Sequence, residues 1–542
     1  MRFTPSVTTI RALFSMVAVI VLAAALARFV YLEADFPIQL TKSGAPMSDE
    51  GWSSNAAVRY WLFGYWYLPG DVNRVIMQPT FHLLQWVTLG ILGVSLPAAR
   101  LTAILLFLGL TILMARTIQI QSGLVGGLVA AALLTTDFHL FAYSRIALID
   151  LPMLFFVIAS LWLMVTLGSK RAFLGGVLAG LACSLALLTK STALFAMPAL
   201  LLIAATGIET SRLRLRRSLA FLAATVLSTG THFSLVMRFF PEDLPVWWFL
   251  IASKIRGGGP GRWERAWSAI RIMGGRDPLL CVALLISAIV ILLHWRKTSL
   301  ASQRISLFYL LGAASLFAVI ASTHYQPVRY FVPFIALAIG IVSLATALAI
   351  SDENRSVAIA LVLLVALHIG LGTHRIVDYL AHPKWSYSIF CEQLKSDLEG
   401  ADRPALLMGD LAPQVSLATG IEAISGLVGT EPAAWRFRKY EPTHLITRGE
   451  FSERLDADLA GMGELELVKT YDVLENHYGG PVHLHRVVQP SNQVGTRNYL
   501  GLSSRRFSQL DGLEEGEDHS TTKVHEEVSP GSKPSANTGL EP

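Results

Sequence analysis

The sequence is poor in charge and in cysteine. Only 15% of its 542 residues are Asp, Glu, Lys or Arg, whereas a soluble domain carries about a quarter. The three cysteines, Cys183, Cys281 and Cys391, show no CxxC or Cys/His ligand spacing. The low charge excludes a chain built from ordinary soluble domains. The number and spacing of the cysteines argue against a disulfide framework and against a zinc site.

Nucleotide-binding loops are also missing. No GxGxxG follows a predicted strand, and no GxxxxGK is present, so the sequence predicts neither a dinucleotide site nor a P-loop. The glycine-rich run Gly257–Gly261 is interpreted as a hinge. We expect no nucleic acid among the partners.

Long apolar runs are what the sequence does contain. Hydrophobic residues make up 53% of the chain, and its mean hydropathy is +0.50. Runs of this kind predict an all-α polytopic membrane protein with about eleven transmembrane helices. The segment Gln78–Ser95 is short and carries polar groups, so we expect it along the outer interface instead. The predicted spans are Ala12–Leu32, Pro97–Thr117, Leu124–Leu140, Leu151–Leu167, Ala172–Leu188, Thr192–Ala205, Leu219–Val236, Leu279–Leu293, Ile305–Ala321, Val328–Leu348 and Val357–Leu371.

Basic residues predict which ends of these helices face the cytoplasm. The densest cluster, Arg212–Arg217, is typical of a cytoplasmic loop, and it fits an N-terminus inside. The predicted outer loop 238–276 is basic as well. There Trp263 and Trp267 recur at helical spacing among arginines, which predicts an amphipathic helix on the membrane surface, with its cations toward lipid phosphates.

The composition changes after Leu371. Four strand-like segments, "PALLMGD", "THLITRG", "LELVKTYDVL" and "PVHLHRVV", alternate with the helix-like "APQVSLATG" and "SERLDADLAGM". This pattern predicts a small extracytoplasmic α/β domain. The expected organisation is a membrane domain over residues 1–375, the α/β domain over 384–488, and a disordered polar tail over 489–542.

Two adjacent acids follow the first apolar run, in "MSDEGWSSN". Asp49 and Glu50 fit either a solvated turn, or a general base or metal ligand just outside the bilayer. The aromatic segment that follows carries Arg59 and Arg74 and suits the lipid headgroup level. It would hold the acids at the water side.

Three further charged residues lie at predicted outer ends of spans. In "FAYSRIALIDLPMLFF", Arg145 fits an interfacial anchor or a ligand contact, and Asp150 fits a helix cap or a functional acid. Lys190, in "LALLTKSTALF", is either a tolerated exception to the positive-inside bias or a phosphate contact.

One more outer turn, "STHYQPVRYFVPF", holds a group of polar and aromatic residues. His324, Tyr325 and Arg329 fit an aromatic belt with a snorkelling arginine. Together they also suit an anionic headgroup, and we favour this second interpretation for the group.

The predicted topology places all these candidates at one water interface. Basic groups there would hold a phosphate leaving group, while a carboxylate takes a proton from an acceptor hydroxyl. Sugar nucleotides are absent outside the cytosol, so such an enzyme needs a lipid-carried donor. The candidate catalytic residues are Asp49, Glu50 and Asp150, and the candidate binding residues are Arg59, Arg74, Arg145, Lys190, His324, Tyr325 and Arg329.

At these residues the chain resembles the GT-C class of integral membrane glycosyltransferases. It is most similar to the branch of protein O-mannosyltransferases and lipid A aminoarabinose transferases. Four motifs occur in the order of that class over about residues 1–375: "SDE", "YSRIALIDLPMLFF", "GLACSLALLTKSTAL" and "RYFVPF". Gln78-Pro79 stands where aminoarabinose transferases have Lys-Pro, and Arg74 or Lys190 would substitute for that lysine.

The resemblance implies a polyprenyl-phosphate sugar donor, inversion at the sugar carbon, and Asp49 as catalytic base or metal-linked acid. We therefore expect a hexosyl or pentosyl transferase in a bacterial cell membrane, with an extracytoplasmic active site. The acceptor would be a hydroxyl of a lipid, glycan or protein. A divalent metal is possible as cofactor, although no ligand set is assigned. The alternatives are a transporter or flippase of a lipid-linked or small solute, and a non-catalytic membrane scaffold.

Overall fold

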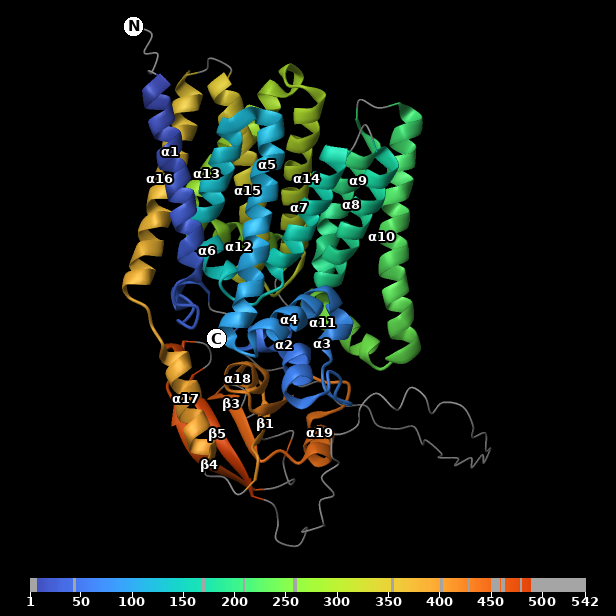
Figure 1. Cartoon of the computed structure of the whole chain (residues 1–542), viewed down its shortest axis with the longest axis vertical. Helices are drawn as coiled ribbons and strands as arrows, with labels where there is room; N and C mark the ends of the chain where they lie inside the picture. The colour runs from blue at the N-terminus through green and yellow to red at the C-terminus, as the bar shows by residue number, and fades with distance from the viewer. Residues whose placement is uncertain are drawn as a thin grey trace, which may run out of the picture. The chain divides into compact units, whose positions relative to one another are not determined.

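The computed structural model describes residues 7–488 except 42–44, 168–170, 208–209, 257–260, 352–354, 400–402, 427, 450–458, 460–463 and 478–479. The tail predicted over 489–542 and nearly all of the helix predicted at "SERLDADLAGM" lie outside these residues. The described chain is a bundle of apolar helices followed by a small sheet (Figure 1).

Within the described residues, seven helical segments are long and apolar enough to cross a membrane. Four shorter apolar helices accompany them, so the chain is a multi-pass membrane protein. The count of eleven spans stays a prediction. The seven are built on α5 (Leu96–Thr136), α8 (Ala172–Thr189), α10 (Ser211–Phe239), α13 (Pro278–His294), α14 (Leu300–Ser322), α15 (Val332–Ser351) and α16 (Arg355–Ala381), and the shorter four on α1 (Val7–Leu26), α7 (Asp150–Leu167), α9 (Met197–Ala205) and α11 (Asp243–Arg256).

Helix α5 joins two of the predicted spans through a break at Gly123. That residue has φ of 78° and ψ of −177°, a backbone conformation that is open almost only to glycine. The short helix α6 (Phe138–Ser144) follows directly, capped by the Asp137 side chain, which accepts from the Leu140 amide at 2.8 Å. At the centre of the bundle, α15 is buried along almost its whole length.

Three helices connect the first span to α5: α2 (Ala45–Phe63), α3 (Arg74–Met77) and α4 (Pro79–Leu92). A 14-residue helix such as α4 is only about 21 Å long, less than a hydrocarbon core of about 30 Å. Figure 1 shows α4 beside α2 at the end of the bundle nearest the sheet. Its length and place suit the interfacial position predicted for Gln78–Ser95.

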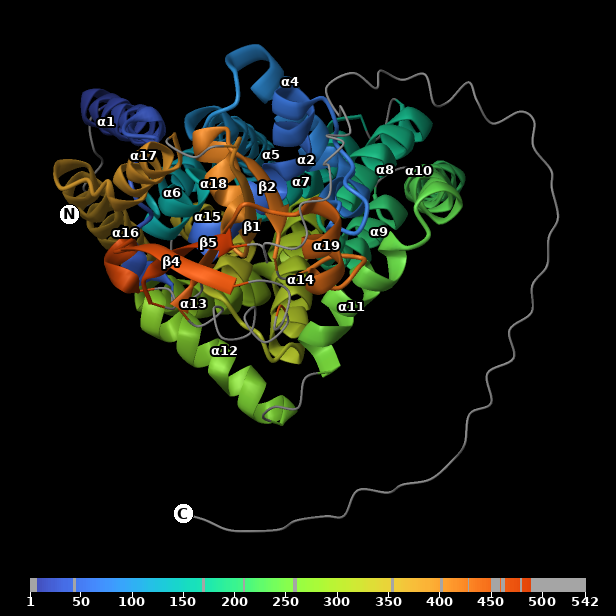
Figure 2. The same cartoon turned by 90° about the horizontal axis from the view of Figure 1, so that it is seen from below.

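Helix α12 (Arg262–Arg276) is the amphipathic helix that the spacing of Trp263 and Trp267 predicts. Trp263 is 89% exposed and Trp267 58% exposed. Seen from below, α12 runs along the outer edge of the helical bundle (Figure 2). Large exposed aromatic rings on such a helix suit contact with lipid.

The C-terminal sheet has five strands in the order β2-β1-β3-β5-β4. The β1 strand pairs in parallel with β2 and β3, whereas β5 pairs antiparallel with β3 and β4. The four predicted strands and the α18 helix are confirmed, while β2, α17 and α19 were not predicted. The elements are β1 (Leu406–Gly409), β2 (Glu422–Ser425), β3 (His444–Arg448), β4 (Glu464–Tyr471), β5 (Val482–Val488), α17 (Ser386–Glu399), α18 (Ala412–Thr419) and α19 (Ala433–Tyr440).

The sheet domain packs onto α2 through α18. The contact is closest at Gly51, where an added Cβ would lie 2.2 Å from backbone atoms of Gln414. The Gly51 amide also donates to the side-chain oxygen of Gln414. Only a residue without a side chain allows this approach, so this packing fixes the orientation of α2 and of the acids that it carries.

Candidate active site

Asp49 and Glu50 both lie on α2, not in a loop. Neighbouring residues of a helix point about 100° apart, so the two carboxylates have different surroundings. Asp49 forms an ion pair with Arg329, which lies in the short 3-10 segment Val328–Phe331 before α15. Its side chain keeps 25% of its surface exposed, while Arg329 keeps 13%. Asp49 is therefore shielded by a cation but still accessible.

A second ion pair joins Asp150, the first residue of α7, to Lys190 at the C-terminal end of α8. Both side chains are nearly buried, at 8% and 12% exposure. The Asp150 carboxylate thus binds a cation, a contact that a residue serving only as a helix cap does not need. Lys190 occupies the turn between α8 and the 3-10 segment Ser191–Ala196.

Tyr330 links the two ion pairs. The Lys190 ammonium lies 4.5 Å from the centre of the Tyr330 ring, and the Arg329 guanidinium carbon lies 5.5 Å from the same centre. Cations at this range are attracted by the negative face of the ring. Asp49, Asp150, Lys190, Arg329 and Tyr330 therefore form one group, which we call the charged cluster.

Arg74 of α3 extends this cluster. Its guanidinium carbon lies 4.7 Å from the centre of the Trp52 ring, and Tyr330 acts on it electrostatically. Burial lowers the pKa of Arg74 to about 10, against the opposing effect of Tyr330, so the side chain stays cationic at neutral pH. Its Nε atom is buried without a hydrogen-bond partner among the described residues.

His82 of α4 lies near Arg74. Burial, reinforced by the positive charge of Arg74, lowers the pKa of His82 to about 3, so the ring is neutral at physiological pH. Both ring nitrogens lack a hydrogen-bond partner among the described residues. Unsatisfied buried donors at Arg74 and His82 indicate a place for a polar ligand.

An apolar cavity of about 740 Å³ begins beside His82. Its walls come mainly from α4 and α2, and the end of α8 closes it where Leu188 precedes Lys190 by two residues. The cavity thus offers apolar surface close to the cations of the charged cluster. Its lining residues are Ala56, Ala57, Tyr60, Trp66, Val75, Pro79, Thr80, His82, Leu83, Leu84, Trp86, Phe156, Leu185, Leu188 and His232.

Glu50 lies outside the charged cluster. It is completely buried and accepts two hydrogen bonds from Arg100, at 2.9 Å and 2.7 Å. The Ala147 amide donates to it at 2.8 Å, and Gln414 donates at 3.3 Å. Glu50 therefore ties α2 to α5, to the loop before α7 and to the sheet domain.

Arg59 and Arg145 are also engaged elsewhere. Arg59 is buried against Asp71 and donates to the carbonyl of Ala423 at 2.9 Å. Arg145 donates to the carbonyls of Val30 and Tyr31, at 2.6 Å and 2.7 Å. Burial lowers the pKa of Arg145 somewhat. Both arginines hold backbone segments in place around the cluster.

His324 and Tyr325 lie at the rim. His324 is exposed, and the Tyr325 ring meets the Tyr330 ring edge-on at 6.0 Å between centres. Of the ten candidates, the structure thus brings together Asp49, Asp150, Lys190 and Arg329, with Arg74 and Tyr325 beside them. The candidates Glu50, Arg59 and Arg145 make other contacts.

The candidate residues chosen from the sequence did not include Tyr330, His82 or Trp52. Tyr330 is adjacent to Arg329, and Trp52 lies three residues after Asp49, one helical turn away. The signal for His82 was its presence as a histidine within an apolar 14-residue helix. Only the tertiary structure distinguishes these residues from interfacial aromatics and core polar groups.

Among the described residues, one group of three side chains has the spacing of a metal site: Asp137, Asp277 and His368. The two ring nitrogens of His368 face different carboxylates, at 3.1 Å from Asp137 and 3.5 Å from Asp277. Each carboxylate also caps a helix, by accepting from an amide of α6 or α13. A metal-binding imidazole turns a single nitrogen to the ion, so this group has the geometry of a histidine bridging two helix caps.

Comparison with known proteins adds two findings. Residues 78–236 match the profile of the family described as dolichyl-phosphate-mannose-protein mannosyltransferase. No curated protein sequence matches the chain. The matched segment includes Asp150, Lys190 and most of the apolar cavity.

Among solved structures, the chain is similar to ArnT from Cupriavidus metallidurans. The apo form superposes with a TM-score of 0.59 at 15% identity, covering 88% of this chain and 100% of ArnT. The form bound to undecaprenyl phosphate gives 0.57 at 14% identity, covering 88% and 99%. The chain therefore has the fold of the GT-C membrane glycosyltransferases, and its resemblance to the protein O-mannosyltransferase branch is confirmed.

Proposed function

We propose that the protein transfers a hexosyl or pentosyl group from a polyprenyl-phosphate-linked donor to a hydroxyl group of a lipid, glycan or protein. The observation that carries the proposal is the charged cluster at the entrance of the apolar cavity. Two acids and three cations gather there, partly shielded from water. Such a site suits a reaction at the junction of a phosphate and a prenyl chain.

The cations would bind the donor phosphate. Arg74 and Arg329 each keep a buried Nε atom without a hydrogen-bond partner among the described residues, and Lys190 adds a third positive charge. Arginine forks and a lysine ammonium bind phosphate oxygens strongly. They also stabilise the negative charge that develops as the phosphate leaves the sugar.

The ion pair between Asp49 and Arg329 suggests how the base is prepared. A donor phosphate competes with Asp49 for the Arg329 guanidinium. When Arg329 turns to the phosphate, the Asp49 carboxylate is free to accept the proton of an acceptor hydroxyl. Asp150 holds Lys190 in place and acts through it, so we propose it as a positioning residue.

The apolar cavity would take the first part of the prenyl chain. Its walls are mostly apolar side chains, contributed by α2, α4, α7 and α8, as a binding pocket for a hydrocarbon requires. ArnT of similar fold has been solved with undecaprenyl phosphate bound. The placement of basic residues along the sequence favours an extracytoplasmic site in the cell membrane.

The direct test is sugar transfer by the purified protein in lipid nanodiscs. A set of radiolabelled polyprenyl-phosphate pentoses and hexoses is supplied with lipid, glycan and peptide acceptors. We expect one donor to yield labelled acceptor together with free polyprenyl phosphate. The Asp49→Asn protein serves as the control for background hydrolysis. If the parent protein instead moves an intact lipid-linked sugar across sealed vesicles without transfer, the transporter alternative holds.

A further inference from the structure

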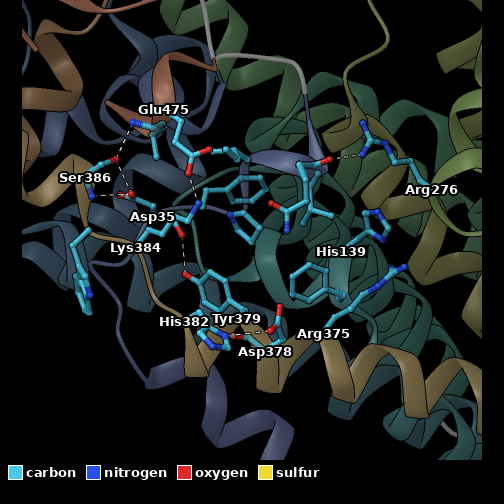
Figure 3. Close-up of a pocket in the computed structure, with 18 of the residues that line it drawn as sticks. Asp35, His139, Arg276, Arg375, Asp378, Tyr379, His382, Lys384, Ser386 and Glu475 are labelled. Atoms are coloured by element: carbon cyan, nitrogen blue, oxygen red, sulfur yellow. Dashed lines mark hydrogen bonds and ion pairs between the residues drawn. The ribbon is translucent and has the colours of Figure 1, made fainter. Parts of the chain in front are cut away.

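A second cavity, of about 850 Å³, shares no lining residue with the apolar cavity. It is formed by the loop Asp35–Leu40, by the ends of α6, α12 and α16, and by the start of α17 (Figure 3). The residue from α12 is Arg276, at the opposite end of that helix from Arg265, which donates to Ser322 in the turn before Arg329. The cavity is therefore distinct from the charged cluster.

Part of this cavity is apolar. Three separate segments contribute apolar side chains to it: Phe36, Leu40, Phe138, Trp385 and Ile389. Together they offer surface for a hydrocarbon chain beside the polar groups. The cavity is thus suited to an amphiphile rather than to a small, fully polar solute.

The acids of the cavity already have partners. Glu475 forms an ion pair with Lys384, and Asp378 lies 3.2 Å from His382. Asp35 accepts hydrogen bonds from the first amides of α17, those of Ser386 at 2.8 Å and Tyr387 at 3.0 Å. Figure 3 shows Asp35, Lys384, Ser386 and Glu475 on one side of the cavity.

The opposite side of the cavity carries three basic side chains. Figure 3 shows His139 between Arg276 and Arg375 there. Among the described residues, Arg276 donates only to the Gln39 carbonyl, and Arg375 has no hydrogen-bond or ion-pair partner. His139 is 2% exposed, and its Nε2 atom has no hydrogen-bond partner among them either. Asp137 and Asp277 act electrostatically on the His139 ring, and Arg375 and Arg276 act on it in the opposite sense. The two carboxylates are already engaged by His368 and by the first turns of α6 and α13.

We propose that this cavity binds the phosphate group of an amphiphile other than the sugar donor. The phosphate would lie between the Arg276 and Arg375 guanidinium groups and accept a hydrogen bond from His139, while the hydrocarbon part contacts Phe36, Leu40 and Trp385. Two arginines converging from different helices favour phosphate, because each fork donates two parallel hydrogen bonds. A buried histidine nitrogen without a partner gains one when the ligand binds.

The test measures lipid binding to the purified full-length protein by native mass spectrometry. The probes are phosphatidic acid and diacylglycerol with the same acyl chains. We expect parent protein to bind phosphatidic acid more tightly than diacylglycerol. Arg276→Gln and Arg375→Gln should each weaken phosphatidic acid binding about tenfold, as the loss of one charged hydrogen bond does. The double variant should lose most of the preference for phosphate.

Arg271→Gln is the matched control, because Arg271 is an exposed arginine on the same α12 helix outside the cavity. Its phosphatidic acid affinity should equal that of the parent. Both arginines of the cavity reach the surface, so their glutamine variants should fold, which thermal unfolding checks. Equal phosphatidic acid binding by the folded double variant and the parent would overturn the proposal.

Two further arms separate the possible sources of the signal. If binding is lost in Lys190→Gln but not in Arg276→Gln, the lipid occupies the charged cluster and the proposal of a second site fails, whatever the fate of the proposed glycosyl transfer. Excess inorganic phosphate then identifies the ligand. If inorganic phosphate displaces the lipid, the site binds phosphate groups in general. If it does not, the site requires the phosphate of a lipid. Either result supports the proposal.

Discussion

Asp49 of α2 and Arg329 of the segment before α15 form an ion pair, although most of the membrane helices separate them in the sequence. The pair connects the first predicted motif, "SDE", to the last one, "RYFVPF". The ion pair places the partly exposed Asp49 carboxylate in contact with the Arg329 guanidinium, a group that binds phosphate well. The reactive arrangement that we propose thus depends on the packing of the whole bundle.

The first prediction concerns Asp49. Asp49→Asn keeps the shape of the side chain and removes its charge. If Asp49 is the base, turnover at saturating donor should fall by about two to four orders of magnitude, measured by sugar transfer with purified, folded protein. Asp472→Asn, which changes an exposed acid of the sheet domain, should retain parent activity. Transfer by Asp49→Asn within about threefold of the parent would rule out this role.

A second prediction concerns the pair of Asp150 and Lys190. Asp150→Asn and Lys190→Gln each remove one charge of a nearly buried pair. Both should lower transfer, because the remaining partner loses its position or its neutralising charge. The double variant should be little worse than the worse single variant, since the two residues act as a unit. Strictly additive losses in kcat/KM would show that the residues act separately. An unchanged rate for Asp150→Asn would instead indicate a helix cap, which Asn supplies equally well.

The third prediction separates Glu50 from its neighbour. Glu50→Gln leaves the buried Arg100 without its carboxylate partner, and breaking such a pair costs about 3–5 kcal/mol. We expect a marked loss of thermal stability, with kcat per folded molecule close to the parent value. Glu466→Gln on the exposed β4 strand should change neither. A Glu50→Gln protein of parent stability but without activity would show that Glu50 takes part in the reaction.

The sequence predicted well those parts of the fold that depend on how apolar and polar residues are distributed along the chain. Apolar runs of spanning length require a helical bundle in lipid, and the alternation after Leu371 predicted four of the five strands. The β2 strand was missed because Glu422–Ser425 has only four residues and no alternation of its own. The sequence predicted two spans, Pro97–Thr117 and Leu124–Leu140, and the break at Gly123 lies between them.

The candidate site was harder to predict, because ion pairing is tertiary. Asp49 and Glu50 look equivalent in the sequence. On the helix they point in different directions, so Asp49 pairs with Arg329 and Glu50 pairs with Arg100. Arg59 looks like a headgroup ligand in an aromatic segment, but Asp71 and the sheet domain bury it. A sequence pattern states which side chains reach one end of the bundle. It does not state which of them become each other's partners.

A fourth prediction tests the topology. Helix α10 has 29 residues, with Arg214 in its first turn, and it ends at Phe239, before Arg262. A single crossing by this helix would place Arg214 and Arg262 on opposite sides of the membrane. A reporter fused near Arg214 should report cytoplasm, and one near Arg262 the outer side. The shorter apolar helix α11 lies between them as well. If both reporters give the same side, α11 also crosses the membrane and our assignment of the outer loop is wrong.

The last prediction concerns pH and His82. Its pKa in the folded protein is about 3, below the ordinary 6.5, because burial disfavours the charged ring. Below pH 6.5 the unfolded chain therefore binds a proton that the folded protein does not, so stability falls as the pH falls toward 3. At pH 5 the loss from this residue is about 2 kcal/mol, from about 1.4 kcal/mol for each pH unit below 6.5. His82→Asn removes the titrating group, and its thermal unfolding temperature should fall less between pH 7.5 and pH 5 than that of the parent. His374→Asn, which changes an exposed histidine of α16, should follow the parent profile. Identical pH profiles for His82→Asn and the parent would show that the His82 ring is solvated, and that the entrance of the apolar cavity is open to water.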